Sequence, residues 1–320
     1  MSKPSAILHI GLSKTSTSLT GHLIRNVREQ LSQLLDMKIG GIGEDIWQVL
    51  LTDLQNSLGT EGRRLPPFMQ IYRQGFSLSD AAKAQIETLC EAYFVTENSK
   101  VLVLQEGYSD LIVFGPEFTD DSNFNFIIST IGAHADIDLV VFVRRQTDFL
   151  GSFYMQSVRE GAVWTFQEYL SAFNLDNLDW FALAEGLSAH PDIGKVTVLP
   201  YEKKVLSPGG YSFAGDAFFK FIDPKLQIGD SAMDIIANPS LDPAHIDLAL
   251  AANRTMTPDE AYEEYKRIAE IHPKPPYQTF SLLSNERRGE LLERYSASNR
   301  ALFEKYMPGF PADFYLDPTA

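Results

Sequence analysis

Four short apolar runs in the first two thirds of the chain constrain the fold most strongly. They are Ala6–Gly11, Val101–Glu106, Asp138–Arg145 and Lys195–Tyr201. Each run is nearly continuously apolar, which is typical of strands that are covered on both faces in a parallel sheet. Because the stretches between them have helical spacing, the pattern predicts an α/β fold in which right-handed crossovers join the strands of a central sheet.

Two of the intervening stretches show helical periodicity. In Thr17–Met37, apolar residues recur every three or four positions, which predicts one helix with an apolar stripe. Ser79–Tyr93 begins with a Ser-Asp cap signal, and its apolar residues share one face. Both segments are therefore expected to pack as helices against the sheet.

The last third of the chain has a different character. After about residue 203 the strand signals stop, and Ser281–Tyr306 predicts one long amphipathic helix. We interpret residues 1–320 as a single domain, in which an α/β core of residues 1–202 carries a helical annex of residues 203–320.

Composition excludes several classes of protein. The formal net charge is −15, so nucleic acid would be repelled by the average surface and a phosphate-bearing ligand needs a local cationic pocket. The single cysteine, Cys90, excludes an intrachain disulfide and a Cys-rich zinc site. The apolar run Leu139–Val143 is far shorter than the roughly 20 residues of a membrane span, and the apolar stretch near the N-terminus is too short for a signal peptide. These features predict a soluble, cytoplasmic protein.

The first polar motif follows the first predicted strand. There the chain reads Gly-Leu-Ser-Lys-Thr-Ser-Thr-Ser, from Gly11 to Ser18, and then enters a predicted helix. Backbone amides at a helix N-terminus, hydroxyl groups and a lysine are suited to bind an anion. The spacing is not that of the loop that binds nucleoside triphosphates, because Lys14 follows Gly11 by only three residues. The alternative is a polar turn with a Ser/Thr helix cap.

The second polar motif follows the third predicted strand. Arg144 and Arg145 stand at its carboxyl end, where open α/β sheets bind ligands, and Ser152 comes eight residues after Arg144 on the next helix. An arginine fork and a hydroxyl donor suit a phosphate group. The alternative is an ordinary helix start, in which the arginines pair with Asp148 or Glu160.

Taken together, the two motifs resemble those of bacterial sulfotransferases that use 3′-phosphoadenosine-5′-phosphosulfate (PAPS). Members of that P-loop family often read L-H-I-G-x-x-K-T-G-T-T, and Leu8–Ser18 fits this pattern except at Ser16, where the family favours glycine. They also carry R-x-P-x-[DE]-x-x-x-S-x-Y after a strand. Arg144–Tyr154 fits except at Gln146, which replaces the usual proline and is expected to loosen the turn.

The resemblance implies a three-layer, P-loop or Rossmann-like fold and an activity. It implies transfer of a sulfuryl group from PAPS to a hydroxyl or amine of a small-molecule or carbohydrate acceptor, with Lys14 stabilising the leaving phosphate. Positioning and electrostatics can suffice for this transfer, so no metal is expected. The implied PAPS-binding residues are Lys14, Thr15, Ser16, Thr17, Ser18, Arg144 and Ser152.

A base must take the proton of the acceptor. Glu106 ends the second predicted strand and is our first candidate; the alternative is a structural carboxylate paired with Lys14 or Arg144. Glu44 and Asp45, in the loop after the first helix, are the second option, and His22, on that helix, is the third. His9, within the first predicted strand, is interpreted as a core residue.

Two other functions stay open at the level of sequence. A kinase-like nucleotide transferase with a degenerate phosphate loop would need a carboxylate for Mg²⁺ at a strand end, a role that Glu106 could fill. A non-catalytic nucleotide-binding protein is conceivable because Ser16 and Gln146 depart from the family pattern.

Overall fold

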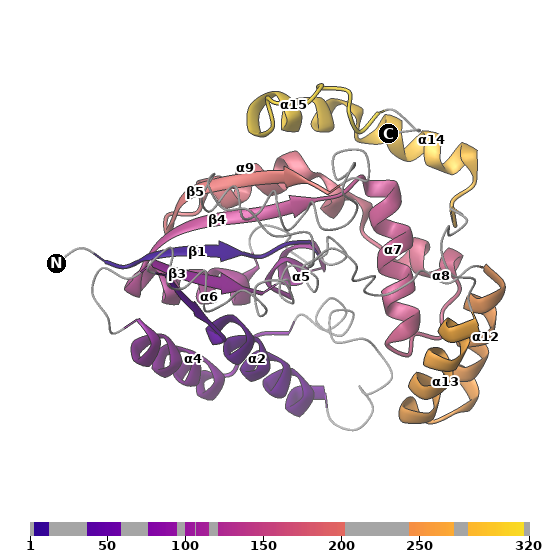
Figure 1. Ribbon diagram of the computed structural model, residues 1–320, viewed down its shortest axis with the longest axis horizontal. Coiled ribbons are helices and arrows are strands. Elements are labelled where there is room, and N and C mark those ends of the chain that lie inside the picture. The colour runs from indigo at the N-terminus through magenta and orange to yellow at the C-terminus, as the bar shows by residue number, and fades with distance from the viewer. Residues whose placement is uncertain are drawn as a thin grey trace.

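A computed structural model describes residues 3–12, 37–58, 76–94, 100–105, 107–114, 121–201, 243–271 and 281–316 of the chain. Its centre is a five-stranded parallel sheet with the order β2-β3-β1-β4-β5 (Figure 1). The strands are β1 (Ser5–His9), β2 (Met37–Gly40), β3 (Lys100–Leu104), β4 (Asp136–Val143) and β5 (Ile193–Pro200). The α/β fold with a central parallel sheet is therefore confirmed.

All four predicted runs form strands, each within about two residues of its expected bounds. Burial explains the continuous apolarity of β3 and β4. Along β4, both alternating faces of Leu139–Val143 are no more than 1% exposed, and the central residues of β3 are equally buried. A strand covered on both sides cannot show an alternating pattern, and its apolar run is then the only signal in the sequence.

Strand β2 was not predicted. Met37, expected as the last residue of a helix over Thr17–Met37, is the first residue of this strand, so that boundary was wrong. Residues 17–36 lie outside the described residues. The strand has only four residues and contains Lys38 and Gly40, so it gives neither a long apolar run nor a clear alternation.

Helices flank the sheet. In Figure 1, α2 (Ile42–Leu58) and α4 (Asp80–Tyr93) lie below it, and α4 also contacts α6 (Ser122–His134), which packs against β4. Helix α4 begins where predicted, because the Ser79 hydroxyl caps it by accepting a hydrogen bond from the Ala82 amide. A short helix, α5 (Gly107–Phe114), follows β3, and α9 (Trp180–Ala189) packs on β5.

The remaining described helices gather around α7 (Gln146–Arg159) and α9. They are α8 (Phe166–Ala172), the 3₁₀ turn η3 (Leu175–Leu178), α12 (Pro243–Thr255), α13 (Pro258–Ile271), α14 (Asn285–Arg294) and α15 (Ser296–Tyr306). Helices α12 and α14 pack on α7, and α15 packs on α9. Residues 243–271 and 281–316 contain no further strand, in keeping with the predicted helical annex.

The prediction of a single helix over Ser281–Tyr306 was wrong. The Ser284 side chain caps α14, so the helix starts later than expected, and the segment divides at Tyr295 into α14 and α15. Tyr295 adopts φ −98° and ψ 7°, and its hydroxyl donates a hydrogen bond of 2.6 Å to the carbonyl of Leu175. Amphipathic spacing continues across such a break, so the sequence pattern does not show it.

The order of the strands indicates where a ligand is expected to bind. The chain leaves β1 toward β2 on one side of the sheet, whereas it leaves the neighbouring strand β4 toward β5 on the other side. Right-handed connections that run in opposite directions lie on opposite faces and leave a crevice between them. The carboxyl ends of β1 and β4 therefore mark the expected binding position.

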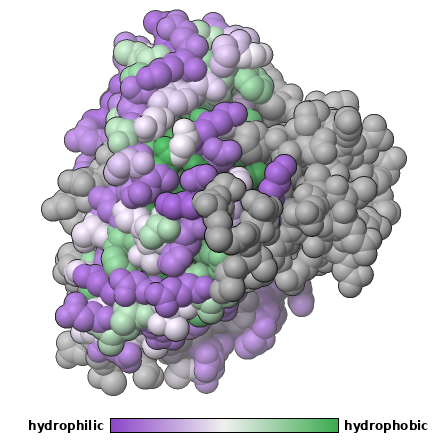
Figure 2. All heavy atoms as spheres, turned by 90° about the vertical axis from the view of Figure 1, so that its left-hand side faces the viewer, coloured by the Kyte–Doolittle hydropathy of each residue, from purple (hydrophilic) through white to green (hydrophobic). Residues whose placement is uncertain are grey.

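Figure 2 shows the face of the molecule at the amino ends of the strands. Polar residues cover most of its described surface, and apolar residues are scattered (Figure 2). Scattered apolar residues are normal on a solvated surface. No helix among the described residues is long and apolar enough to cross a membrane.

Candidate functional site

The end of β1 is held against β4 beyond the last residue of the strand. The amide of Ile10 donates to the carbonyl of Val140 at 3.1 Å, and the amide of Leu12 donates to that of Phe142 at 3.2 Å. Between them, Gly11 has φ +43°, a left-handed conformation that glycine adopts without a steric penalty. The chain thus reaches the predicted phosphate loop at a point beside β4, two residues before Arg144.

The predicted loop itself lies outside the described residues. This applies to Lys14, Thr15, Ser16, Thr17 and Ser18. It applies equally to two candidates for the base, Glu106 and His22. Their roles stay predictions.

Arg144 lies at the carboxyl end of β4, as predicted, and is partly exposed. Its guanidinium lies over the ring of Tyr201, 5.6 Å from the ring centroid, within the range of a cation–π contact. Its carbonyl accepts a hydrogen bond of 2.7 Å from the indole of Trp180. Tyr201 is fixed in turn, because its amide donates to the carbonyl of Val143 at 2.7 Å.

Tyr201 was not among the predicted site residues. Its signal in the sequence is its position at the end of a predicted strand, the same signal that singled out Arg144. Both residues therefore lie at the carboxyl edge of the sheet, at the ends of adjacent strands.

Arg145 differs from its neighbour. Its side chain is only 1% exposed and lies 3.8 Å from the carboxylate of Asp148. The alternative in which an arginine pairs with Asp148 therefore holds for Arg145. Of the two arginines, Arg144 is the one that solvent can reach.

Ser152 lies on α7, six residues after the helix begins, or about 9 Å along its axis. It is partly exposed and one turn beyond Asp148 on the same face. A lone carboxylate there would repel a phosphate. Arg288 of α14 offsets its charge by donating to Asp148 at 2.7 Å.

The expectation that Gln146 loosens the turn was wrong. Gln146 is 1% exposed, and its side-chain amide hydrogen-bonds to the side chain of Asn299 and to the carbonyl of Leu178. With these partners, the Gln146 side chain fixes the turn through hydrogen bonds, whereas a proline would fix it through its ring. The sequence around Gln146 shows only that the proline is missing, because its partner Asn299 lies 153 residues away.

At the end of β3, Gln105 connects three segments. Its amide donates to the carbonyl of His9, and its side chain donates to the carbonyl of Gly43 at 3.3 Å and accepts from the amide of Gly107 at 2.9 Å. These bonds join the ends of β1 and β3 to the beginnings of α2 and α5. Gln105 therefore stabilises the carboxyl edge of the sheet at β1 and β3.

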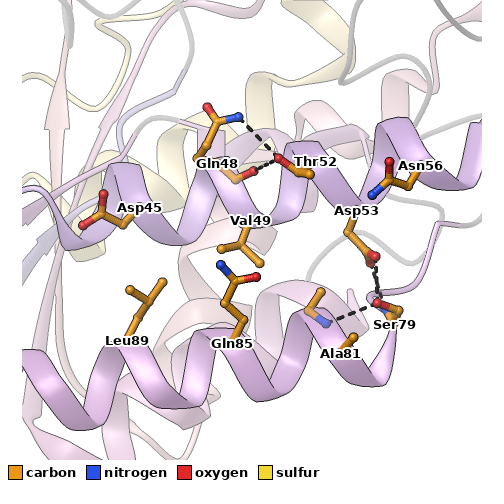
Figure 3. Close-up of a pocket in the computed structure, with 11 residues that line it drawn as sticks. Asp45, Gln48, Val49, Thr52, Asp53, Asn56, Ser79, Ala81, Gln85 and Leu89 are labelled. Atoms are coloured by element: carbon orange, nitrogen blue, oxygen red, sulfur yellow. Dashed lines mark hydrogen bonds between the residues drawn. The ribbon is translucent and has the colours of Figure 1, made fainter.

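Two further candidates for the base, Glu44 and Asp45, were expected in a loop, but they are exposed in the first turn of α2, because this helix begins only two residues after β2 ends. Asp45 lines a groove of about 430 Å³ between α2 and α4 (Figure 3). The groove also contains Asp53, whose carboxylate accepts hydrogen bonds from the amide and hydroxyl of Ser79. Its lining residues include two carboxylates and no lysine or arginine, so it is electrostatically unsuited to a phosphate.

His9 is a core residue, as interpreted from the sequence. It is fully buried, and its ring lies 5.4 Å from that of Phe142 in a tilted arrangement. Burial lowers its pKa from 6.5 to about 4, so the imidazole is neutral near pH 7. Because the ring is neutral and fully buried, His9 is not a candidate for the base.

Comparisons with protein-family models, with curated proteins and with solved structures find no significant match. Within the described residues, no group of three or more His, Cys, Asp or Glu side chains is arranged to hold a metal ion.

Proposed function

We propose that this chain is a PAPS-dependent sulfotransferase. The observation that carries the proposal is the hydrogen bond between Leu12 and Phe142 beyond the end of β1. From this pair of residues, each chain segment needs two more residues to reach a cationic side chain, Lys14 on one and Arg144 on the other. Two cations beside one crevice suit a ligand with two separate anionic groups.

The two segments would divide the ligand between them. Lys14 and the hydroxyl-rich residues Thr15–Ser18 would bind the 5′-phosphosulfate, while Arg144 and Ser152 would bind the 3′-phosphate. The fixed backbone of Arg144 and its contact with Tyr201 support this division, since a side chain held in place before binding loses less entropy on binding.

The chemistry follows from these positions. An oxygen or nitrogen of the acceptor attacks the sulfur in line, the bond from sulfur to the bridging oxygen breaks, and 3′,5′-adenosine bisphosphate leaves. Lys14 would stabilise the charge that develops on the bridging oxygen, and Glu106 would accept the proton of the acceptor. The acceptor is a small molecule or a carbohydrate, and a cytoplasmic location belongs to the same proposal.

A binding experiment followed by a transfer assay tests the proposal. Thermal unfolding is measured with 3′,5′-adenosine bisphosphate and, separately, with ATP and Mg²⁺. We expect stabilisation by the bisphosphate alone, because Arg144 occupies the end of β4. A response to ATP and Mg²⁺ alone would support a kinase-like transferase instead.

Transfer of labelled sulfate from PAPS to a panel of alcohols, phenols, sugars and amines then separates an enzyme from a binding protein. Lys14→Ala should abolish this transfer, whereas Glu106→Gln should lower its rate and alter its pH profile. Full activity of the Lys14→Ala variant would contradict the assignment of Lys14. An unchanged rate and pH profile of Glu106→Gln would exclude Glu106 as the base.

A further inference from the structure

The turn between β4 and α7, residues 143–148, is connected to the later part of the chain at several points. We call this segment the β4–α7 turn. The hydroxyl of Tyr315 donates to the carbonyl of Val143 at 2.8 Å, and the indole of Trp180 donates to that of Arg144. Arg288 pairs with Asp148. The turn that presents Arg144 is thus held by α9, α14 and the C-terminal segment.

A fully buried connection joins Gln146 to Asn299 of α15. Each side-chain amide donates to the carbonyl oxygen of the other, at 2.9 and 3.1 Å. Gln146 also donates to the carbonyl of Leu178 in η3 at 3.1 Å. The two residues are 1% and 0% exposed. Removing one partner leaves the other amide unsatisfied in the core, so the pair fixes a unique arrangement of α7 against α15.

The position of Gln146 gives this pair a role in ligand binding. Gln146 is the first residue of α7 and stands two residues after Arg144. Arg145, which precedes α7, makes no capping hydrogen bond with its side chain. The amide pair and the contact with η3 hold the first residue of α7, and Arg288 holds the third residue, Asp148. Together these contacts set the direction in which the chain leaves Arg144.

We propose that Gln146 and Asn299 are positioning residues for Arg144. By fixing the first residue of α7 to α15, they hold the Arg144 side chain in the direction needed to bind the 3′-phosphate. This inference rests on the proposed function. It gives the C-terminal helices a part in recognition of the ligand.

The backbone suggests a way to replace the pair. Arg145 has φ −49° and ψ 130°, the extended conformation that a following proline requires, and proline is favoured at the first position of a helix. Gln146→Pro should therefore stiffen the turn through its ring. In a chain without the Asn299 amide, this substitution should restore the position of Arg144.

The experiment measures affinity for 3′,5′-adenosine bisphosphate and for 5′-AMP by calorimetry, and the ratio of the two reports the 3′-phosphate contact. We expect Asn299→Leu to lower this ratio about tenfold, which corresponds to 1.4 kcal/mol. Gln146→Pro with Asn299→Leu should return the ratio to within about threefold of the unmodified chain. If Asn299→Leu alone does not fold, Gln146→Met with Asn299→Leu provides the comparison, since replacing both partners by apolar groups is nearly neutral for stability.

Asn253→Leu is the matched control. Asn253 donates to the carbonyls of Val158 and Ala162 at the far end of α7, so its loss should lower stability and leave the ratio unchanged. An unchanged ratio in Asn299→Leu or in Gln146→Met with Asn299→Leu, or an equal loss in Asn253→Leu, would overturn the positioning role. An unmodified chain that binds the two nucleotides equally would refute the proposed function itself.

Discussion

Protonation of His9 should couple the stability of the fold to pH. His9 is the last residue of β1 and fully buried, and burial lowers its pKa to about 4. In the unfolded chain a histidine titrates near 6.5. Between these two values the unfolded state binds a proton that the folded state excludes. The stabilisation is therefore complete above pH 6.5 and is lost as the pH falls toward 4.

The size of this effect follows from the two pKa values. A depression from 6.5 to about 4 corresponds to a loss of about 3 kcal/mol once the pH is below 4. At pH 5, where the unfolded histidine is almost fully protonated, the loss relative to pH 7 is about 2 kcal/mol. This is a substantial share of the roughly 5–15 kcal/mol that stabilises a typical domain.

Urea unfolding of the unmodified chain and of His9→Leu at pH 7, 6 and 5 measures this contribution. The free energy of unfolding of the unmodified chain should fall by about 2 kcal/mol more than that of the variant between pH 7 and pH 5. Burial also lowers the pKa of the partly buried His190. Because His190 is present in both proteins, its contribution to the pH dependence cancels in the difference. Equal pH dependence of the two proteins would refute the reasoning.

Three further predictions test the packing around the site. A Cβ at Gly107 would lie 2.5 Å from the ring of Trp47. Gly107→Ala should therefore lower the free energy of unfolding by about 1–3 kcal/mol and shift the tryptophan fluorescence. An unshifted spectrum and an unchanged stability would contradict this contact. Asn253→Leu removes two hydrogen bonds to carbonyls at the end of α7 and should cost about 1–3 kcal/mol in denaturant unfolding, whereas a loss below about 0.5 kcal/mol would mean that water replaces them. Burial raises the pKa of Cys90 to about 12, so the thiol should react with a disulfide reagent only in urea, and rapid labelling of the folded chain would show that α4 opens.

Local pattern was enough to predict the elements that dominate the core. β1, β3, β4 and β5 follow from continuous apolar runs, and β3 and β4 are buried on both faces along their centres. The cap of α4 follows from Ser79, since the signal and its hydrogen bond lie within four residues. Strand β2 and the break at Tyr295 depend on pairing with β3 and on a contact with Leu175, and neither partner is near in sequence.

The candidate site divides in the same way. The positions of Arg144 and Ser152 follow from strand order and helix geometry, because carboxyl ends of parallel strands meet at one edge. The burial of Arg145 and the partners of Gln146 depend on where the C-terminal helices pack. Contacts between residues more than 100 positions apart leave no periodicity in a single sequence, so residue patterns alone did not predict them.

If this chain binds PAPS as proposed, Arg144 should supply most of its affinity for the 3′-phosphate. Calorimetry compares 3′,5′-adenosine bisphosphate with 5′-AMP in the unmodified chain and in Arg144→Gln, with Arg159→Gln, at the far end of α7, as a control of equal charge. The account predicts a preference for the bisphosphate of at least about tenfold in the unmodified chain and in the control, which Arg144→Gln abolishes. Equal affinity for the two nucleotides in the unmodified chain, or a preference that survives Arg144→Gln, would contradict it.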